Sequence, residues 1–230
     1  MKFIRKGRKP AALARFERKN AATPQAATYA GLAPETRRAL VKKMLEEQGR
    51  LCAYTMRCIG VSTDARDYHI EHIRPRSRCP ELQIEYKNML LCAPGGGCDW
   101  GARCKDEADV DEANFVSPLN ETCETRFEYR RDGFVRASEE NDAAAASTLN
   151  LLNLNHKELV AERGEAMRRF GLGPNAQKAL SAQKAERLGA RICERNLDGS
   201  FEPFCIAIRQ AAERIARRAR ERSARLRTAR

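Results

Sequence analysis

The feature that most constrains the fold is a group of cysteines set around two neighbouring histidines, His69 and His72. Five of the nine cysteines belong to this group, at positions Cys52, Cys58, Cys92, Cys98 and Cys104. An odd total argues against a framework of disulfides alone. Two cysteine pairs separated by a loop are the usual layout of a structural zinc site, which can stabilise a module with a small core. We therefore predict zinc ligands among Cys52, Cys58, Cys92 and Cys98.

The net charge limits the class of partner. The chain has 43 Lys and Arg against 31 Asp and Glu, a net charge of +12, which favours nucleic acid or an acidic partner surface. No stretch approaches the roughly 20 apolar residues of a membrane span, and residues 1–19 lack the apolar segment of a secretory signal. We expect a cytoplasmic protein without membrane association, in which metal ligation is favoured over disulfides.

The chain divides into three regions. Residues 1–50 are a basic arm followed by a helix over 33–48, which begins at Pro34 and ends before Gly49. Residues 51–136 hold the cysteine group, short strands at 68–70 and 89–91, and a hairpin. Its turn is expected at Asp132 and Gly133.

Residues 137–230 form a helical region with a basic tail. We expect helices over 143–154, from an N-cap at Asn155 to Phe170, over 175–195 and over 203–227. In the tail, a broad face carries Arg217, Arg218, Arg222 and Arg225, which suits phosphate groups or an acidic partner, although such runs are often a solvated helix face. The predicted fold class is α+β, mostly α-helical.

Three residues are suited to phosphodiester hydrolysis. Glu71 can hold Mg²⁺ or Mn²⁺, and His72 can take a proton from water near neutral pH. Adjacent side chains of a strand point to opposite faces, so a bend or a crossing helix must bring the two to one phosphate. Asn88, sixteen residues after His72, could hold the imidazole ring. A later Asp could complete the metal ligands, and the metal would stabilise charge on the leaving oxygen.

The order of these residues resembles the core of HNH endonucleases. It is carried by Cys52, His69-Ile70-Glu71-His72, Tyr86-Lys87-Asn88-Met89-Leu90-Leu91-Cys92, Cys98-Asp99 and Lys105. More closely, residues 1–170 resemble the HNH subunit of Septu-type antiphage systems, which is also found beside some retrons. Further matching segments are Glu47–Tyr54, Val116–Leu119, Phe127–Tyr129 and Leu151–Asn155, together with Arg163.

The resemblance implies a ββα-metal core with named roles. His72 would be the general base, Glu71 a metal ligand, and Asn88 the residue that orients the base and its loop. The third HNH position falls on Asp99, and Asp106 competes for that role. The implied cofactors are Mg²⁺ or Mn²⁺ for catalysis and structural Zn²⁺.

The cysteine pattern departs from the family in two respects. The family pattern has a cysteine where Thr55 stands. The five residues between Cys52 and Cys58 also exceed the two to four that are common between zinc ligands. Cys58 would replace the missing ligand, with Cys104 as a further candidate, or else the zinc site is degraded.

The expected function is that of a metal-dependent HNH endonuclease, with Arg74, Arg76 and Lys105 as contacts for the substrate. DNA is the default substrate, and RNA, including tRNA, stays open. The resemblance implies antiphage defence with an ABC- or SMC-like ATPase partner, and it extends to a retron reverse transcriptase with its DNA–RNA product. The alternative is a non-catalytic, zinc-stabilised nucleic-acid-binding or docking subunit, which needs no general base.

Overall fold

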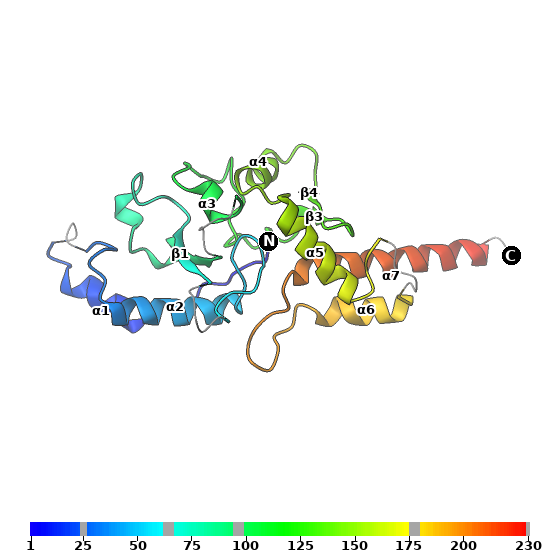
Figure 1. The fold of residues 1–230 in the computed structure, drawn as a ribbon, viewed down its shortest axis with the longest axis horizontal. Helices are drawn as coiled ribbons and strands as arrows, with labels where there is room; N and C mark the ends of the chain where they lie inside the picture. Colours follow the sequence, from blue (N-terminus) through cyan, green and yellow to red (C-terminus); the bar gives the residue numbers. More distant parts are fainter. Residues whose placement is uncertain (24–26, 62–66, 94–98, 175–179, 229–230) are drawn as a thin grey trace.

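The computed structural model describes residues 1–23, 27–61, 67–93, 99–174 and 180–228. Within these ranges it has seven α-helices and two small antiparallel sheets, which confirms the α+β, mostly helical class. Figure 1 shows an elongated molecule, with α1 (Ala11–Lys19) and α2 (Pro34–Gln48) at one end and α6 (Ala182–Arg191) and α7 (Cys205–Thr228) at the other. No described helix has both the length and the apolar character that crossing a membrane requires.

The predicted helix before the cysteine group is present as α2. It begins at Pro34, whose fixed φ suits a first helical turn, and Gly49 ends it in the left-handed region at φ 55°. A Cβ on Gly49 would also lie 2.4 Å from the ring of Phe201. Gly49 is therefore required twice, by its backbone angle and by the close approach of the segment before α7.

Gln48 joins α2 to the strand that follows the candidate site. Its buried side-chain amide donates to the carbonyl oxygens of Leu51 and Leu91, and its Oε1 accepts from the Leu91 amide at 2.8 Å. Leu91 belongs to β2 (Met89–Cys92). Every polar atom of a buried side chain needs such a partner, so α2 and β2 are held together at this point.

The strands predicted around the site form a hairpin of β1 (His69–His72) and β2. Residues paired across it are His69 with Cys92, Ile70 with Leu91, Glu71 with Leu90, and His72 with Met89. Two 3₁₀ turns, η2 (Pro80–Leu82) and η3 (Tyr86–Asn88), lie between the strands. The short helix α3 (Ala102–Lys105) follows.

A second hairpin, β3 (Phe127–Tyr129) and β4 (Val135–Ala137), contacts α4 (Ala143–Leu151) and α7 through its strands and α5 (Lys157–Arg169) through its turn. The predicted turn residue Gly133 has φ 94°, and a Cβ there would come within 2.0 Å of the Val160 carbonyl oxygen. Buried Arg163 of α5 donates to the carbonyl oxygens of Gly133, at 2.7 Å, and Leu154. Arg163 thus fixes the hairpin on α5.

Two expectations for the helical region need correction. The N-cap of α5 is His156, whose Nδ1 accepts from the Glu158 amide, whereas Asn155 bonds both backbone groups of Val135. Asn155 therefore joins α5 to β4 instead of starting the helix. Of the helix expected over 175–195, the structure has α6, which begins after the N-cap Ser181 and ends at Arg191, while residues 175–179 lie outside the described ranges.

Candidate active site

β1 presents its side chains alternately to two faces. His69 and Glu71 share one face, and Ile70 and His72 share the other, because successive residues of a strand point in opposite directions. The strand itself therefore does not turn Glu71 and His72 toward one another. Their charges still interact, since Glu71 acts to raise the pKa of His72.

The imidazole ring of His72 is held on two sides. Nε2 lies 2.9 Å from the backbone carbonyl oxygen of Gln83, and the ring meets that of Tyr29 edge-on, with centroids 4.9 Å apart. A carbonyl oxygen only accepts hydrogen bonds, so Nε2 carries the proton and Nδ1 is the acceptor nitrogen of the neutral ring. This tautomer is the one that a general base acting through Nδ1 requires.

The surroundings of His72 favour its neutral form. Burial is the largest influence and lowers the pKa of the ring, which is 8% exposed. The Gln83 carbonyl and Glu71 raise the pKa, and the positive charges of Arg76 and Lys105 lower it. The net shift is downward, so the ring is a neutral acceptor at pH 7.

Asn88 acts on the backbone around His72, as the sequence predicts for a loop-orienting residue. Its Oδ1 accepts from the Arg74 amide at 2.8 Å, and its Nδ2 donates to the carbonyl oxygens of Arg74 and Leu82. The next residue after Leu82 is Gln83, which holds the imidazole. Asn88 therefore acts on His72 through the loop, because its hydrogen bonds all go to backbone groups and not to the ring.

Glu71 lies in a different environment. Its Oε1 is 2.9 Å from the Nζ of Lys105, whose side chain is fully buried, and its Oε2 is 3.5 Å from His69 Nε2. Burial and the nearby charge of Glu71 raise the pKa of Tyr54, which keeps that phenol neutral beside the carboxylate. The carboxylate thus has one buried ammonium partner and one imidazole neighbour.

The third metal ligand expected from the sequence is not brought to Glu71. Asp99 is exposed, and its backbone carbonyl accepts from Asn153 Nδ2 at 2.7 Å. Asp106 is also exposed, at the end of α3. Among the described residues, no group of three or more His, Cys, Asp or Glu is placed to hold a metal ion.

The cysteines come together only in part. Cys52 and Cys92 are buried and hydrogen-bonded to each other, and the Thr55 side chain also bonds Cys52. Burial alone would raise the pKa of Cys52, but bonds from Cys92, Thr55 and the Ala93 amide together lower it to about 6. Burial and Cys52 raise the pKa of Cys92 well above its usual value. The hydrogen bonds therefore favour the thiolate at Cys52 and the neutral thiol at Cys92.

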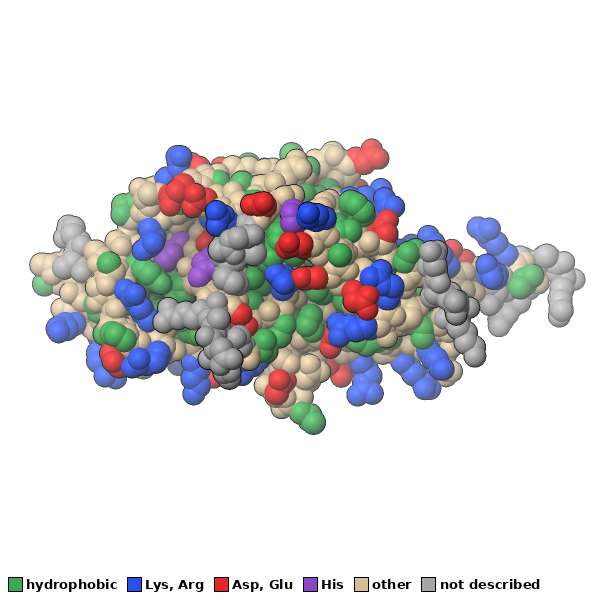
Figure 2. All heavy atoms as spheres, in the orientation of Figure 1, with side chains coloured by type: hydrophobic (Ala, Val, Ile, Leu, Met, Phe, Trp, Pro, Cys, Tyr) green, Lys and Arg blue, Asp and Glu red, His purple; other side chains and the backbone are tan. Residues whose placement is uncertain are grey.

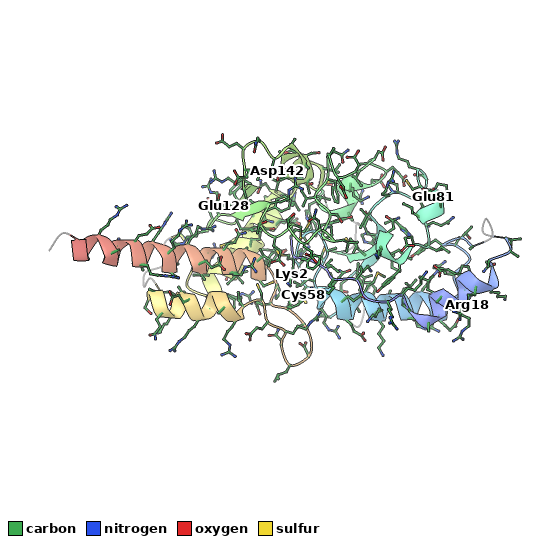
Figure 3. All side chains as sticks on the ribbon, turned by 180° about the vertical axis from the view of Figure 1, so that it is seen from behind. Lys2, Arg18, Cys58, Glu81, Glu128 and Asp142 are labelled. Atoms are coloured by element: carbon green, nitrogen blue, oxygen red, sulfur yellow. The ribbon has the colours of Figure 1, made fainter. Side chains whose placement is uncertain are left out.

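Cys58 does not join this pair. It is exposed, and its charged neighbours are Asp67, Arg50 and Asp198, none of which acts on Cys52. Figure 3 labels Cys58 near the end of α2, apart from the hairpin strands. Cys98 lies outside the described residues. The described chain therefore supplies two sulfur ligands for zinc, and a threonine hydroxyl occupies the place where the resemblance calls for a third cysteine.

The donor atoms around Glu71 are one carboxylate and one imidazole, so a metal ion held here would need waters to complete its ligands. Glu71 supplies one carboxylate and His69 an imidazole on the same face. His69 Nδ1 is buried without a hydrogen-bond partner in the described chain, and the Tyr54 hydroxyl lies beside the Glu71 carboxylate. Mg²⁺ commonly takes one or two protein ligands and keeps several waters. Such an ion would compete with the Lys105 ammonium, which lies 2.9 Å from Glu71 Oε1.

The three expected phosphate contacts have different positions. Arg74 and Arg76 are exposed, and the Arg76 guanidinium lies 4.8 Å from the centre of the Tyr29 ring. Lys105 is instead buried, with 1% of its surface exposed, because it is paired with Glu71. It therefore stabilises the site from within and does not face a substrate phosphate.

Sequence reasoning missed the residues that enclose the histidine. Tyr29 precedes α2 by a few residues, and no spacing relates it to the hairpin. Gln83 contributes only its backbone carbonyl, which any residue could supply. The one usable signal is the short distance of Gln83 from Asn88 in the chain.

Comparison with known proteins adds no relative to this geometry: no protein-family model matches the chain, and no curated protein matches it.

Proposed function

We propose that the chain is a metal-dependent endonuclease of the HNH type, which hydrolyses phosphodiester bonds of nucleic acid. One observation carries the proposal. His72 is a neutral imidazole whose Nε2 is bound to the Gln83 carbonyl, in a loop that Asn88 fixes. A binding surface has no need of a fixed tautomer, whereas proton abstraction depends on it.

The proposed chemistry assigns a step to each residue. His72 Nδ1 takes the proton of the attacking water, and the bond from Nε2 to Gln83 keeps the ring in place as its charge changes. Asn88 holds both segments that flank the ring. Glu71, with His69 beside it, would hold Mg²⁺ or Mn²⁺, which supplies stabilisation of the charge on the leaving oxygen.

The element order supports the same proposal. Two antiparallel strands are followed by a short helix, and Lys105 of that helix reaches Glu71 of the first strand. This is the order of a ββα-metal core, which we propose for residues 69–105. The zinc site remains a prediction, since it depends on Cys98. The ATPase partner, the retron product and antiphage defence also stay predictions from the resemblance.

A non-catalytic nucleic-acid-binding or docking subunit is the second candidate function. The ion pair between Glu71 and buried Lys105 favours it, because a carboxylate that is already neutralised resembles a structural group. The low exposure of His72 favours it as well. This candidate predicts nucleic-acid binding with no cleavage under any divalent ion.

The test compares wild type with His72→Ala on plasmid DNA and total RNA, each with Mg²⁺, with Mn²⁺ and with a chelator. We expect the variant to lose about 10²- to 10⁴-fold in rate, the usual contribution of a general base. His156→Asn is the matched control, since asparagine keeps the helix cap that His156 provides. Equal cleavage by wild type and His72→Ala rejects the proposal, and binding without cleavage by wild type supports the second candidate.

A further inference from the structure

A large groove lies beside the candidate active site. Its volume is about 1160 Å³, and its walls come from α2, the start of β1 and the loop at 195–199. Small-molecule pockets usually measure roughly 300–1,000 Å³, so this groove suits part of a long ligand. Figure 2 shows Lys and Arg side chains gathered over α1 and α2, and histidine surface over β1.

The rim of the groove is strongly basic. Six cationic residues line it, against two acidic ones, Glu46 and Asp198. The cationic residues are Arg37, Arg38, Lys42, Arg50, Arg76 and Arg195. Of these, only Arg38 has a described carboxylate within 4 Å, that of exposed Glu35.

Backbone carbonyls, and not carboxylates, hold three of these arginines. Arg37 donates to the carbonyl oxygens of Tyr29 and Ala30, Arg50 to that of Gly60, and Arg195 to those of Glu47 and Gly199. A carbonyl fixes the direction of a guanidinium but leaves its full positive charge. Arg37 Nε is in addition buried without a described partner. The rim is therefore preorganised for anions.

The interior of the groove is apolar and aromatic. Leu32, Val41, Leu45 and Ile70 line it together with Tyr68. A double helix presents phosphates outward and keeps its bases stacked inside, so it would not use such a surface. A single strand offers phosphates to a basic rim and unstacked bases to aromatic and apolar side chains.

The groove reaches both halves of the candidate site. His69 and Tyr29 are among its lining residues. His69 Nε2 is 3.5 Å from the Glu71 carboxylate, and the Tyr29 ring contacts that of His72. A strand in the groove would therefore contact His69, which is next to Glu71, and Tyr29, which is next to His72.

Building on the proposed nuclease function, we infer that this groove binds single-stranded nucleic acid and leads it to His72. The rim residues contact successive phosphates, and Tyr68 stacks on a base. An acidic peptide would satisfy the rim but would have no stacking partner for Tyr68. A single strand is thus the occupant that uses both parts of the groove.

The experiment measures binding by fluorescence anisotropy in His72→Ala protein, so that no cleavage interferes. The probes are a labelled single strand of DNA, the same sequence as RNA, the corresponding duplex, and polyglutamate as an unlabelled competitor. The groove variant is Lys42→Gln with Arg76→Gln, which removes two exposed rim cations. The matched control, Lys184→Gln with Arg187→Gln, makes the same charge change on the exposed face of α6.

We expect tighter binding of the single strand than of the duplex. The groove variant should weaken single-strand binding about tenfold and reduce the slope of log K against log salt by roughly 0.7 per lost contact. The α6 control should weaken single-strand binding by no more than about threefold, which is the expected effect of one contact, and should change the salt slope by no more than about 0.7. Tyr68→Leu should reduce the preference for single strand over duplex.

Four results would overturn the inference: tighter binding of the duplex, equal losses in the groove and α6 variants, a Tyr68→Leu protein with its preference intact, or competition by polyglutamate as strong as by an unlabelled single strand. Failure of the nuclease proposal gives a separate result. Wild type would then bind the single strand through the groove yet cleave nothing. Conversely, if cleavage depends on His72 but KM is unchanged in the groove variant, the groove inference is rejected and the nuclease proposal is supported.

Discussion

Two arginine-rich regions of the molecule differ in what holds their guanidinium groups. In the groove, Arg37, Arg50 and Arg195 are held by backbone carbonyl oxygens. On α7, some arginines lie within 4 Å of a carboxylate, for instance Arg217 near Glu221 and Arg220 near Glu186. Figure 1 shows α7 extending beyond the rest of the molecule, so exposure alone would favour it as the anion-binding surface.

From this difference we expect the partner of an arginine to matter more for anion binding than the number of arginines. A carboxylate cancels the field that attracts an anion, and a carbonyl does not. The sequence singles out the tail because eight arginines lie between residues 214 and 230. The structure adds a second set of arginines, those of the groove from residue 37 to residue 195, of which only Arg38 has a described carboxylate within 4 Å.

The largest effect is expected where a carbonyl-held arginine is buried. Arg163→Met should lower the free energy of unfolding by about 3 kcal/mol, because it leaves the carbonyls of Gly133 and Leu154 without their donor. Urea unfolding measures the change. Arg168→Met, which removes an exposed carboxylate-paired arginine from the same helix, should change it by no more than about 0.5 kcal/mol. Equal losses would mean that neither the burial of Arg163 nor its carbonyl partners add to stability.

Charge reversal should reduce kcat/KM more in the groove than on α7. Lys42→Glu with Arg76→Glu is expected to reduce kcat/KM about 100-fold at low salt, through weaker attraction of the phosphates. Arg217→Glu with Arg218→Glu should reduce it less than about tenfold, since Arg217 is already partly neutralised. Initial rates at several salt concentrations give both values. A larger loss on α7 would reverse the comparison.

Removing the carboxylates that pair with arginines of α7 should allow these arginines to bind nucleic acid, as we propose for the groove. Glu186→Gln with Glu221→Gln frees Arg220 and Arg217, and we expect nucleic-acid binding to strengthen about threefold for each. Glu139→Gln with Glu140→Gln gives the same net charge from exposed positions outside α7. If this control strengthens binding equally, total charge and not pairing decides affinity.

The smallest effect is expected from the protonation of His72 as pH changes. Burial lowers the pKa of His72, so the folded state binds the proton less readily than the unfolded state, whose histidine has its ordinary pKa near 6.5. Stability should therefore fall as pH decreases below that value, and kcat/KM should fall through the lowered pKa. Unfolding and rate profiles between pH 5 and 8 test this. Profiles of His72→Gln should be flatter, and an unchanged stability profile would contradict the assigned pKa shift.

Local signals predicted much of the fold. Pro34 and Gly49 set the ends of α2 because each has a backbone preference that acts without tertiary context. The turn at Gly133 was found for the same reason. Asn155 was misassigned as a cap because an asparagine can bond either its own helix or a neighbouring strand, and only packing decides between them.

The site was predicted less completely than the fold. Asn88 lies where a loop-orienting residue was expected, since its role depends on the nearby chain. The burial of Lys105 depends on how distant segments pack, whereas Cys58 is separated from Cys52 by a local turn, in which Cys58 pairs with Leu51. Tyr29 also reaches His72 through such packing. Spacing along a sequence carries no information on these contacts.

The bonds between Gln48 and Leu91 join the helix that forms a wall of the groove to the hairpin that carries His72. The two cannot slide past each other without breaking buried hydrogen bonds. A strand bound along α2 would therefore reach the imidazole at a constant distance from its binding site. Cleavage should therefore occur at a constant distance from the bound segment of the strand, whatever its base sequence.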